Sequence, residues 1–392
     1  MRLWALCGAL AAGEYIASFA PEFAPIWPVP AIGATRVALF GFGLGVKGWG
    51  YAFAVLFGIV IFLFASRGDE QRYLESPWMR GRDGRYRQRQ EVLVGVAKTV
   101  KDDLSWRVGI GLDGDRETAS LSRAILLGER RRLPSRTKRL FVESGTMHVF
   151  AISGLHVMAI AKVLTIGLGL FLVPIRFAGL LSIPLLWGYV MLIGGAPSAV
   201  RAAMMATIME IAPVFWRRAN GFRAWELTFL IVHVYDPLLI ANVGNALSFA
   251  VMLAIVVVGD FAKSMPGWRK SLLVTLAAWA VGVPISAHVF GRVTPGGMVA
   301  NLVLIATAKA TVVAGALGVG VSYLSETVAE HVNNFSALGI KSMVLVAEAV
   351  SRLPGANFET TAWSVLTCVE WYAALALIGF LMSKASARCR AL

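Results

Sequence analysis

The residues best suited to chemistry lie in one short stretch at the start of a long apolar segment. His148 and His156 supply imidazoles, and Ser153 supplies a hydroxyl three residues before His156, all within residues 145–157. Polar side chains in a membrane-type apolar segment need partners, so they usually face a bundle interior or an aqueous path. We therefore predict that this stretch faces other polar groups or a path through the protein.

Three interpretations of these residues stay open. On a helix, Ser153 and His156 would lie side by side as a hydroxyl and a base, which permits a membrane hydrolase. No carboxylate lies nearby in the sequence to orient either ring. His148 and His156 are eight apart, whereas two-histidine metal motifs on helices use a spacing of four. We predict no metal and no cofactor, and either a structural polar contact or the lining of a translocation path.

The glycines of this stretch, Gly145 and Gly154, permit close helix contacts or a break in the helix that frees backbone groups for the path. Lys309 lies isolated in another apolar segment, where it either faces the same path or reaches a helix end by snorkelling. Asn301, in the same segment, is expected to hydrogen-bond between helices.

A second polar motif surrounds Arg201. The preceding Gly194-Gly195-Ala196-Pro197 predicts a helix that begins near Pro197, so Arg201 lies in or just after its first turn. A cation there is unfavourable unless an anion binds both the cation and the helix end. Phosphate would do so; the alternatives are a lipid headgroup or a carboxylate such as Glu14 or Glu210.

Composition defines the class of protein. Hydrophobic residues make up 57% of the 392 residues, charged residues only 15%, and the formal net charge is +14. This describes a polytopic membrane protein whose Lys and Arg lie in loops, where they meet phosphates or anionic lipid. The three cysteines are widely separated and show no metal or disulfide spacing.

The predicted fold is all-α, with about 10–12 transmembrane helices. Basic clusters at alternate junctions predict a multi-pass membrane protein, and with an N-terminus inside they fall on the cytoplasmic side. Residues 336–353 are charged enough to lie at the interface as an amphipathic helix, and whether they span decides the side of the C-terminus. The apolar segments cover residues 3–20, 31–46, 50–66, 147–173, 177–195, 198–216, 224–241, 245–262, 271–290, 296–322 and 362–383.

The chain is expected to have three parts: N-terminal transmembrane helices over 1–66, a basic extramembrane segment over 67–140, and a channel domain over 141–392. Within the basic segment, apolar residues at helical spacing predict an amphipathic helix over 91–108, although alternation from Trp106 to Leu112 permits a short strand. A second helix is predicted over 119–127.

Over residues 119–383 the sequence resembles the competence domain of the ComEC family, an inner-membrane channel for transforming DNA. Asn301 and Arg201 fall in matching motifs. The motifs run in the family's order: Leu126-Leu127-Gly128-Glu129, the His-xxxx-Ser-Gly-Leu-His core at 148–156, Ser198 to Ala202, Asp236-Pro237, Leu247-Ser248-Phe249, Pro284, Phe290-Gly291, Asn301-Leu302 and Leu353 to Ala356.

The resemblance implies a passive conduit for single-stranded DNA, with His148, Ser153, Gly154, His156, Arg201, Asn301 and Lys309 as its path or motif residues. The sequence has no Gly-xxxx-Gly-Lys-Ser/Thr loop and no His-x-His-x-Asp motif, and it lacks the family's C-terminal metallo-β-lactamase-like domain. A cytoplasmic DNA-translocating ATPase and a nuclease are therefore expected as separate chains. The alternatives are a permease for a small anion and a hydrolase that uses Ser153 and His156. The sequence does not define the oligomeric state.

Overall fold

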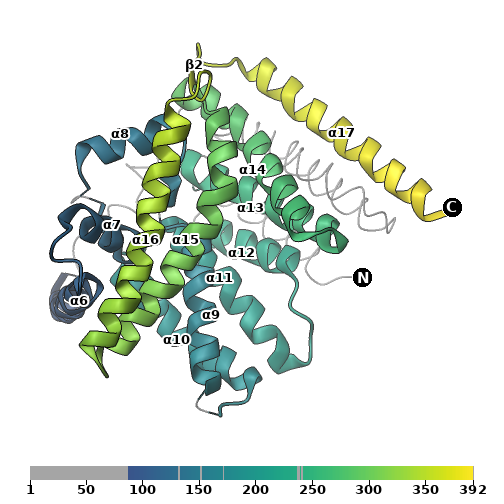
Figure 1. Cartoon of the computed structure of the whole chain (residues 1–392). Coiled ribbons are helices and arrows are strands. Elements are labelled where there is room, and N and C mark those ends of the chain that lie inside the picture. The colour runs from purple at the N-terminus through teal and green to yellow at the C-terminus, as the bar shows by residue number, and fades with distance from the viewer. Residues whose placement is uncertain are drawn as a thin grey trace. The chain divides into compact units, whose positions relative to one another are not determined.

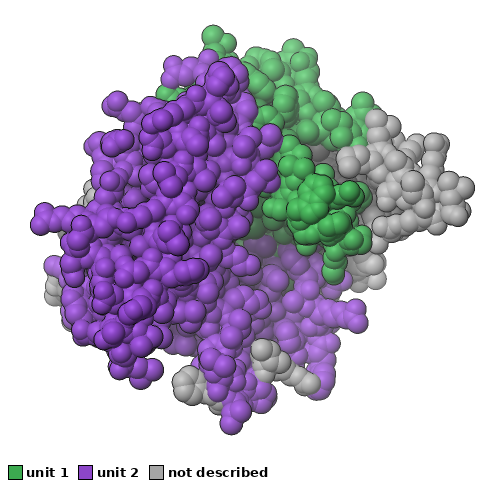
Figure 2. Space-filling view, in the orientation of Figure 1, with its two compact units in different colours: residues 1–74, 225–292, 360–392 green, residues 75–224, 293–359 purple. Residues whose placement is uncertain are grey.

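A computed structural model describes residues 87–391, apart from 131–132, 151, 171, 236–238 and 240–241. The chain divides into two compact units (Figure 2): unit 1 comprises residues 1–74, 225–292 and 360–392, and unit 2 comprises residues 75–224 and 293–359. The three predicted spans before residue 67 lie outside the described residues, as does Glu14.

Unit 2 contains two groups of helices, from either end of its sequence (Figure 1). Its last long helices, α15 and α16, run side by side and make the most extensive helix pair. Its elements are α6 (Arg87–Gly109), α7 (Arg116–Leu127), α8 (Ser135–Glu143), η2 (Met147–Val149), α9 (Gly154–Leu170), α10 (Ile175–Leu192), α11 (Pro197–Ile211), η3 (Ala212–Phe215), α15 (Pro295–Ser322) and α16 (Glu326–Ser351).

Unit 1 is helical in its described part. Within it, α13 packs against α14, and α14 packs against α17. Of the two short strands, β1 (Arg292–Val293) lies at the boundary between the two units and β2 (Phe358–Glu359) lies in unit 2. The remaining elements are α12 (Gly221–Tyr235), which begins at the end of unit 2, α13 (Val243–Phe261), η5 (Ala262–Ser264), α14 (Gly267–Phe290) and α17 (Val365–Ala391).

Five helical segments in the described part are long and apolar enough to cross a membrane. They confirm the predicted spans at 147–173, 198–216, 245–262, 271–290 and 296–322. The spans predicted at 177–195 and 362–383 correspond to shorter apolar helices, Phe177–Leu192 and Val365–Gly379. The five candidate spans are Met147–Leu170, Pro197–Phe215, Val243–Ser264, Gly267–Phe290 and Pro295–Ser322.

Small residues let α15 and α16 approach closely. Gly318 of α15 meets the side chain of Asn333, and Gly339 of α16 meets the side chain of Thr311. Such contacts are typical of membrane helices, where packing rather than exclusion of water holds helices together. Residues 336–353 therefore lie lengthwise against a candidate span instead of flat by themselves, although α16 is not among the five most apolar helices.

The described part of the basic segment also packs in unit 2. The helix predicted over 91–108 is confirmed as α6, so the strand alternative from Trp106 to Leu112 is wrong, and the helix predicted over 119–127 is confirmed as α7. Leu121 and Ile125 of α7 are buried in the same core as Leu304 and Ile340. The three-part division of the chain stays a prediction; the compact units divide the chain at other positions.

Candidate functional site

The site begins where α8 ends in a glycine turn. Gly145 has φ +71°, and the N–H groups of Gly145 and Thr146 donate to the carbonyls of Val142 (3.1 Å) and Phe141 (2.8 Å). This is a Schellman ending, which requires the left-handed conformation that glycine adopts without strain. The turn directs the chain away from α8 and leads into the 3₁₀ turn η2, which carries His148.

The second part of the site is the start of α9. Ser153 precedes the first helical residue, Gly154, and its backbone N–H donates to Nδ1 of His156 at 3.2 Å. The Ser153 hydroxyl lies 2.9 Å from the same nitrogen. This is the arrangement of a capping box, with histidine in the place usually taken by Glu or Gln. Since Nδ1 accepts, the ring proton of neutral His156 lies on Nε2.

That Nε2 group has no internal partner. His156 is 1% exposed, and its Nε2 makes no hydrogen bond with any residue the structure describes. A buried donor without a partner loses its hydration and gains nothing in return, which is unfavourable by about 1–3 kcal/mol. Such a group in a native protein is expected to serve a ligand or water.

His148 lies beside His156, although the two residues are not on one helix. The helix is broken between η2 and α9, so the spacing of eight does not set their angle; Gly145 and Gly154 flank the break, one of the two alternatives predicted for them. His156 is close enough to His148 and Arg130 for their charges to interact. His148 hydrogen-bonds the backbone of Gly145 and the side chain of Asn301, and it is exposed, whereas Val149 and Phe150 beside it are buried.

The amino end of α15 forms another side of the site. A Cβ atom on Gly297 would lie 3.1 Å from the carbonyl oxygen of Gly145, so the first turn of α15 contacts that peptide directly. One turn further, the side chain of Asn301 lies next to the His148 ring. The Oδ1 atom of Asn301 is buried and has no hydrogen-bond partner within the described part. The Asn301 side chain is nevertheless a hydrogen-bond partner of His148 on η2, and the predicted hydrogen bond of Asn301 between long helices stays a prediction.

The amino end of α11 reaches the same place. The Ser198 hydroxyl donates to the carbonyl of Ile152 at 2.9 Å, directly before Ser153. The helix begins at Pro197, as predicted, and Arg201, one turn after Ser198, is 7% exposed. The predicted position of Arg201 in or just after the first turn of α11 is therefore confirmed.

Three helix amino ends thus lie along the segment 145–156: α15 at the Gly145 peptide, α11 at the Ile152 carbonyl, and α9, which begins directly after Ser153. Each end carries a partial positive charge from its backbone N–H groups. His148, His156 and Arg130 add imidazoles and a guanidinium, and we call this group of residues, with Asn301, the polar cluster. Its chemistry suits a negatively charged or hydrogen-bonding ligand.

The structure assembles most, but not all, of the residues predicted from the sequence. It brings together His148, Ser153, Gly154, His156 and Asn301. Lys309 lies two turns beyond Asn301 and lines a separate groove between α15 and α16. Glu210, offered as a partner for Arg201, has an ion pair with Lys162 at 3.7 Å.

Arg130 was not predicted to belong to the site. It directly follows the Leu-Leu-Gly-Glu motif, which is the signal that the sequence offered. Gly128 of that motif contacts the Ile152 side chain, because a Cβ there would lie 2.8 Å from it. This contact places the loop after α7 next to the start of α9.

Two features of enzyme sites, a group of metal ligands and a carboxylate that orients a catalytic histidine, can be checked in the described residues around the polar cluster. Among the described residues, no group of three or more His, Cys, Asp or Glu side chains could hold a metal ion. Ser153 and His156 are hydrogen-bonded, as a hydrolase would require, but the described residues give His156 Nε2 no carboxylate to orient it. The capping geometry accounts for the Ser153 to His156 bond without catalysis.

Comparison with known proteins identifies the family. A family model described as Competence protein matches residues 125–385. This chain belongs to the competence protein family. The competence match contains the polar cluster, and together with the five apolar helices it makes this chain a multi-pass, all-α membrane protein.

Relatives of the competence chain include ComE operon protein 3 of Bacillus subtilis, 27% identical over 216 residues, which are 53% of this chain and 27% of the relative. An uncharacterized protein of Aquifex aeolicus is 29% identical over 185 residues, 46% of this chain and 43% of the relative. The uncharacterized protein YcaI of Escherichia coli is 27% identical over 197 residues, 46% of this chain and 26% of the relative. The chain spans less than half the length of each relative. No solved structure matches the chain.

Proposed function

We propose that this protein is a passive conduit for single-stranded DNA in the inner membrane during natural transformation, and that the polar cluster contacts the passing strand. Membership of the competence protein family supports a role in DNA uptake. The motor and any nuclease are proposed to be separate proteins, since the sequence carries neither an ATP-binding loop nor a metal-nuclease motif.

One observation supports the proposal: three helix amino ends contact or begin in the segment 145–156, which carries His148 and His156 and lies near Arg130. A phosphate backbone that crosses lipid loses water and counterions, so positive dipoles and donors must replace them. His148 is exposed, which makes it accessible to a strand, while the unpartnered His156 Nε2 supplies a second donor behind it. Asn301 adds an amide that can bond a base edge as well as a backbone.

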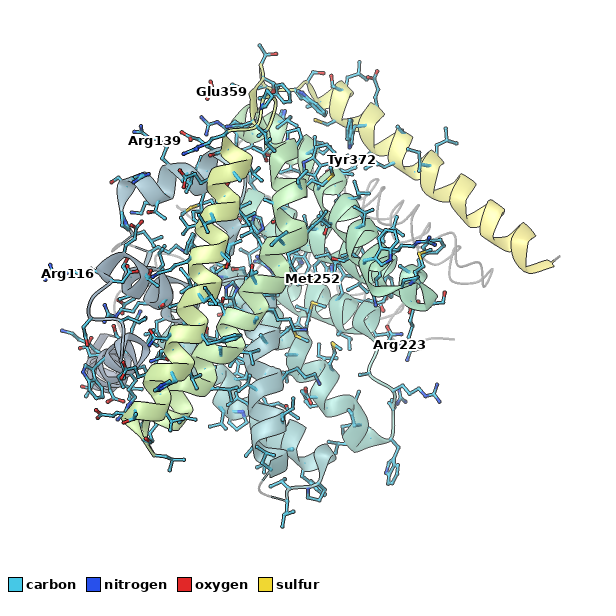
Figure 3. The ribbon with its side chains drawn as sticks, in the orientation of Figure 1. Arg116, Arg139, Arg223, Met252, Glu359 and Tyr372 are labelled. Carbon is cyan, nitrogen blue, oxygen red and sulfur yellow. The ribbon has the colours of Figure 1, made fainter. Side chains whose placement is uncertain are left out.

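The test is transformation of the native host after single replacements, with membrane insertion verified. His148→Leu removes a hydrogen-bond donor from the cluster and Arg130→Gln removes a charge, and each is expected to lower transformation by about 10- to 100-fold, the size of a lost hydrogen bond to a charged group. Arg116→Gln is the matched control, because Arg116 is exposed on α7 and points away from the helices (Figure 3). Equal transformation by all three variants would refute the site.

A second experiment distinguishes the conduit from the two alternative functions, a small-anion permease and a hydrolase. Purified protein in vesicles is titrated with a fluorescent single-stranded oligonucleotide and with inorganic phosphate. A conduit binds the oligonucleotide, and phosphate competes only weakly, because a strand makes many contacts at once. Saturation by phosphate with no oligonucleotide binding would instead support a small-anion permease. Covalent labelling of Ser153 by an activated phosphonate would support the hydrolase.

A further inference from the structure

A groove runs along the outer face of the α15 and α16 pair, apart from the polar cluster. It has a volume of about 750 Å³ and is lined almost wholly by apolar side chains. Ala306, Ala310 and Ala314 form a row four residues apart on α15, and Val332 and Phe335 of α16 form the facing wall. The row of small residues makes the groove deep enough to receive a chain of methylene groups.

Two basic side chains lie in this apolar groove. Lys309 is exposed and makes no hydrogen bond or ion pair with any residue in the described part of the chain. His331 bonds the Thr327 carbonyl through Nδ1 at 2.7 Å, which leaves Nε2 directed to other partners. A cation bordered by apolar side chains in a membrane helix requires an anion, and the lining itself provides none.

The polar end of the groove lies toward the turn between the two helices. The candidate span on α15 ends at Ser322, and exposed charged residues follow at the start of α16. By the helical rise of 1.5 Å per residue, His331 lies roughly 9 Å from that turn and Lys309 roughly 20 Å from it. A lysine side chain at that depth extends toward the interface, so its ammonium group approaches the level of His331.

We propose that this groove binds an anionic glycerophospholipid, with its phosphate between His331 and Lys309 and one acyl chain along the alanine row toward Ala306. The lipid combines the two chemistries that the lining presents together: an apolar chain and a negative charge. Lipid surrounds such a face in a membrane, and a basic pocket between helices selects headgroups by charge.

The experiment is native mass spectrometry of the full-length protein, incubated with equal amounts of phosphatidylglycerol and phosphatidylcholine. The wild type is expected to bind phosphatidylglycerol in preference to phosphatidylcholine. Lys309→Gln is expected to weaken the binding of phosphatidylglycerol about fivefold, which corresponds to about 1 kcal/mol, and to leave the binding of phosphatidylcholine unchanged. Lys263→Gln is the matched control, because Lys263 is an exposed lysine at the end of α13, outside the groove. Equal effects of the two lysine substitutions overturn the proposal.

A second variant tests the chain-binding part. Ala310→Trp fills the groove and keeps Lys309, so it is expected to displace both lipids; unchanged lipid binding overturns the proposal. Ala310→Leu adds a smaller side chain and is expected to weaken the binding of both lipids only partially. A loss of binding that grows with the size of the side chain distinguishes a filled groove from a misfolded protein. Displacement of the lipid by inorganic phosphate alone also contradicts the proposal, because a free anion leaves the acyl chain bound.

A lipid-binding role for Lys309 makes different predictions from a role for Lys309 on the DNA path. A lipid site predicts that Lys309→Gln changes lipid preference while transformation per inserted protein stays within about twofold of the wild type. A path role requires that transformation falls and lipid preference is retained, which would overturn the lipid site. Because the groove and the polar cluster are separate, failure of either proposal is distinguishable from failure of the other.

Discussion

Histidines in the two units differ in how their ring nitrogens are bonded. In unit 1, His233 bonds the Phe229 carbonyl through Nδ1 (2.8 Å) and Asn245 through Nε2 (3.0 Å). In unit 2, Nδ1 of His156 bonds Ser153, and Nε2 is buried without a partner in the described part. The centroid of the His233 ring also lies 4.0 Å from that of Phe229, with the two rings tilted at 38°. The comparison separates histidines that hold a structure together from one whose bonding is left incomplete.

His288 and His148 both have hydrogen-bond partners, and they differ in exposure. His288 bonds the Trp363 carbonyl through Nδ1 at 2.6 Å, and it therefore has the local partner expected of a structural histidine. His148 has an exposed ring and lies beside His156 and Asn301. A histidine in a membrane helix is thus no evidence of function by itself; the missing partner is what indicates a ligand.

The largest expected effect comes from replacing the incompletely bonded histidine. His156→Leu removes the Nε2 donor, and we expect transformation per inserted protein to fall by about 10- to 100-fold, since a hydrogen bond to a charged strand is lost. Protein stability should change by no more than about 1 kcal/mol, the size of a lost cap, because the partner that loses its hydrogen bonds, Ser153, is only half-buried. A large fall in thermal stability with normal transformation would show that His156 is a structural histidine like His233.

The next effect tests the turn that positions His148. Gly145→Ala places a Cβ atom 2.6 Å from Thr294 at φ +71°, so it is expected to destabilise the protein by about 2 kcal/mol and to lower transformation with it. Gly167→Ala on α9 is the control, because nothing lies within 4 Å of its added Cβ. Thermal unfolding in detergent gives the midpoint of each of these two variants. Equal midpoints for Gly145→Ala and Gly167→Ala would contradict the close approach of α15 to Gly145.

A smaller effect is expected for the fully bonded histidine. His233→Leu leaves the buried Asn245 amide short of a partner, which should lower the free energy of unfolding by about 1–2 kcal/mol. Transformation per inserted protein should stay near that of the wild type. A strong loss of transformation at unchanged stability would show that unit 1 also carries a functional histidine.

The smallest effect concerns an ion pair outside the candidate spans. The Thr118 backbone N–H and Lys341, 2.9 Å away, lower the pKa of Asp115 from 3.8 to about 2. Because the folded pKa lies below the unfolded one, the stabilisation is complete above about pH 4 and is lost as the pH falls toward 2. Asp115 is 39% exposed, so solvent screening keeps the contribution below about 1 kcal/mol.

Unfolding midpoints of wild type and Asp115→Asn, measured between pH 6 and pH 2.5, check this prediction. The difference between the two proteins should shrink as the pH falls, whereas Asp113→Asn, at an exposed neighbouring carboxylate, should follow the wild type at every pH. Equal midpoints of the two proteins at every pH would show that Asp115 acts only as the N-cap of α7, which asparagine also provides, and not through its charge.

The features read correctly from the sequence are local ones. Apolar length identified the spans, the Gly-Gly-Ala-Pro motif placed the start of α11, and helical spacing identified α6 and α7. These signals act between residues a few positions apart, so a single sequence contains them in full.

The tertiary structure alone decided which helix ends meet. Gly145 contacts Gly297 across 152 residues, and Ser198 bonds Ile152 across 46. Contacts of this kind depend on how whole helices pack, which no local pattern encodes. The same packing left the His156 Nε2 group unpartnered, added Arg130 to the polar cluster and placed Lys309 in a groove of its own, because burial is a property of the assembled helices and not of one segment.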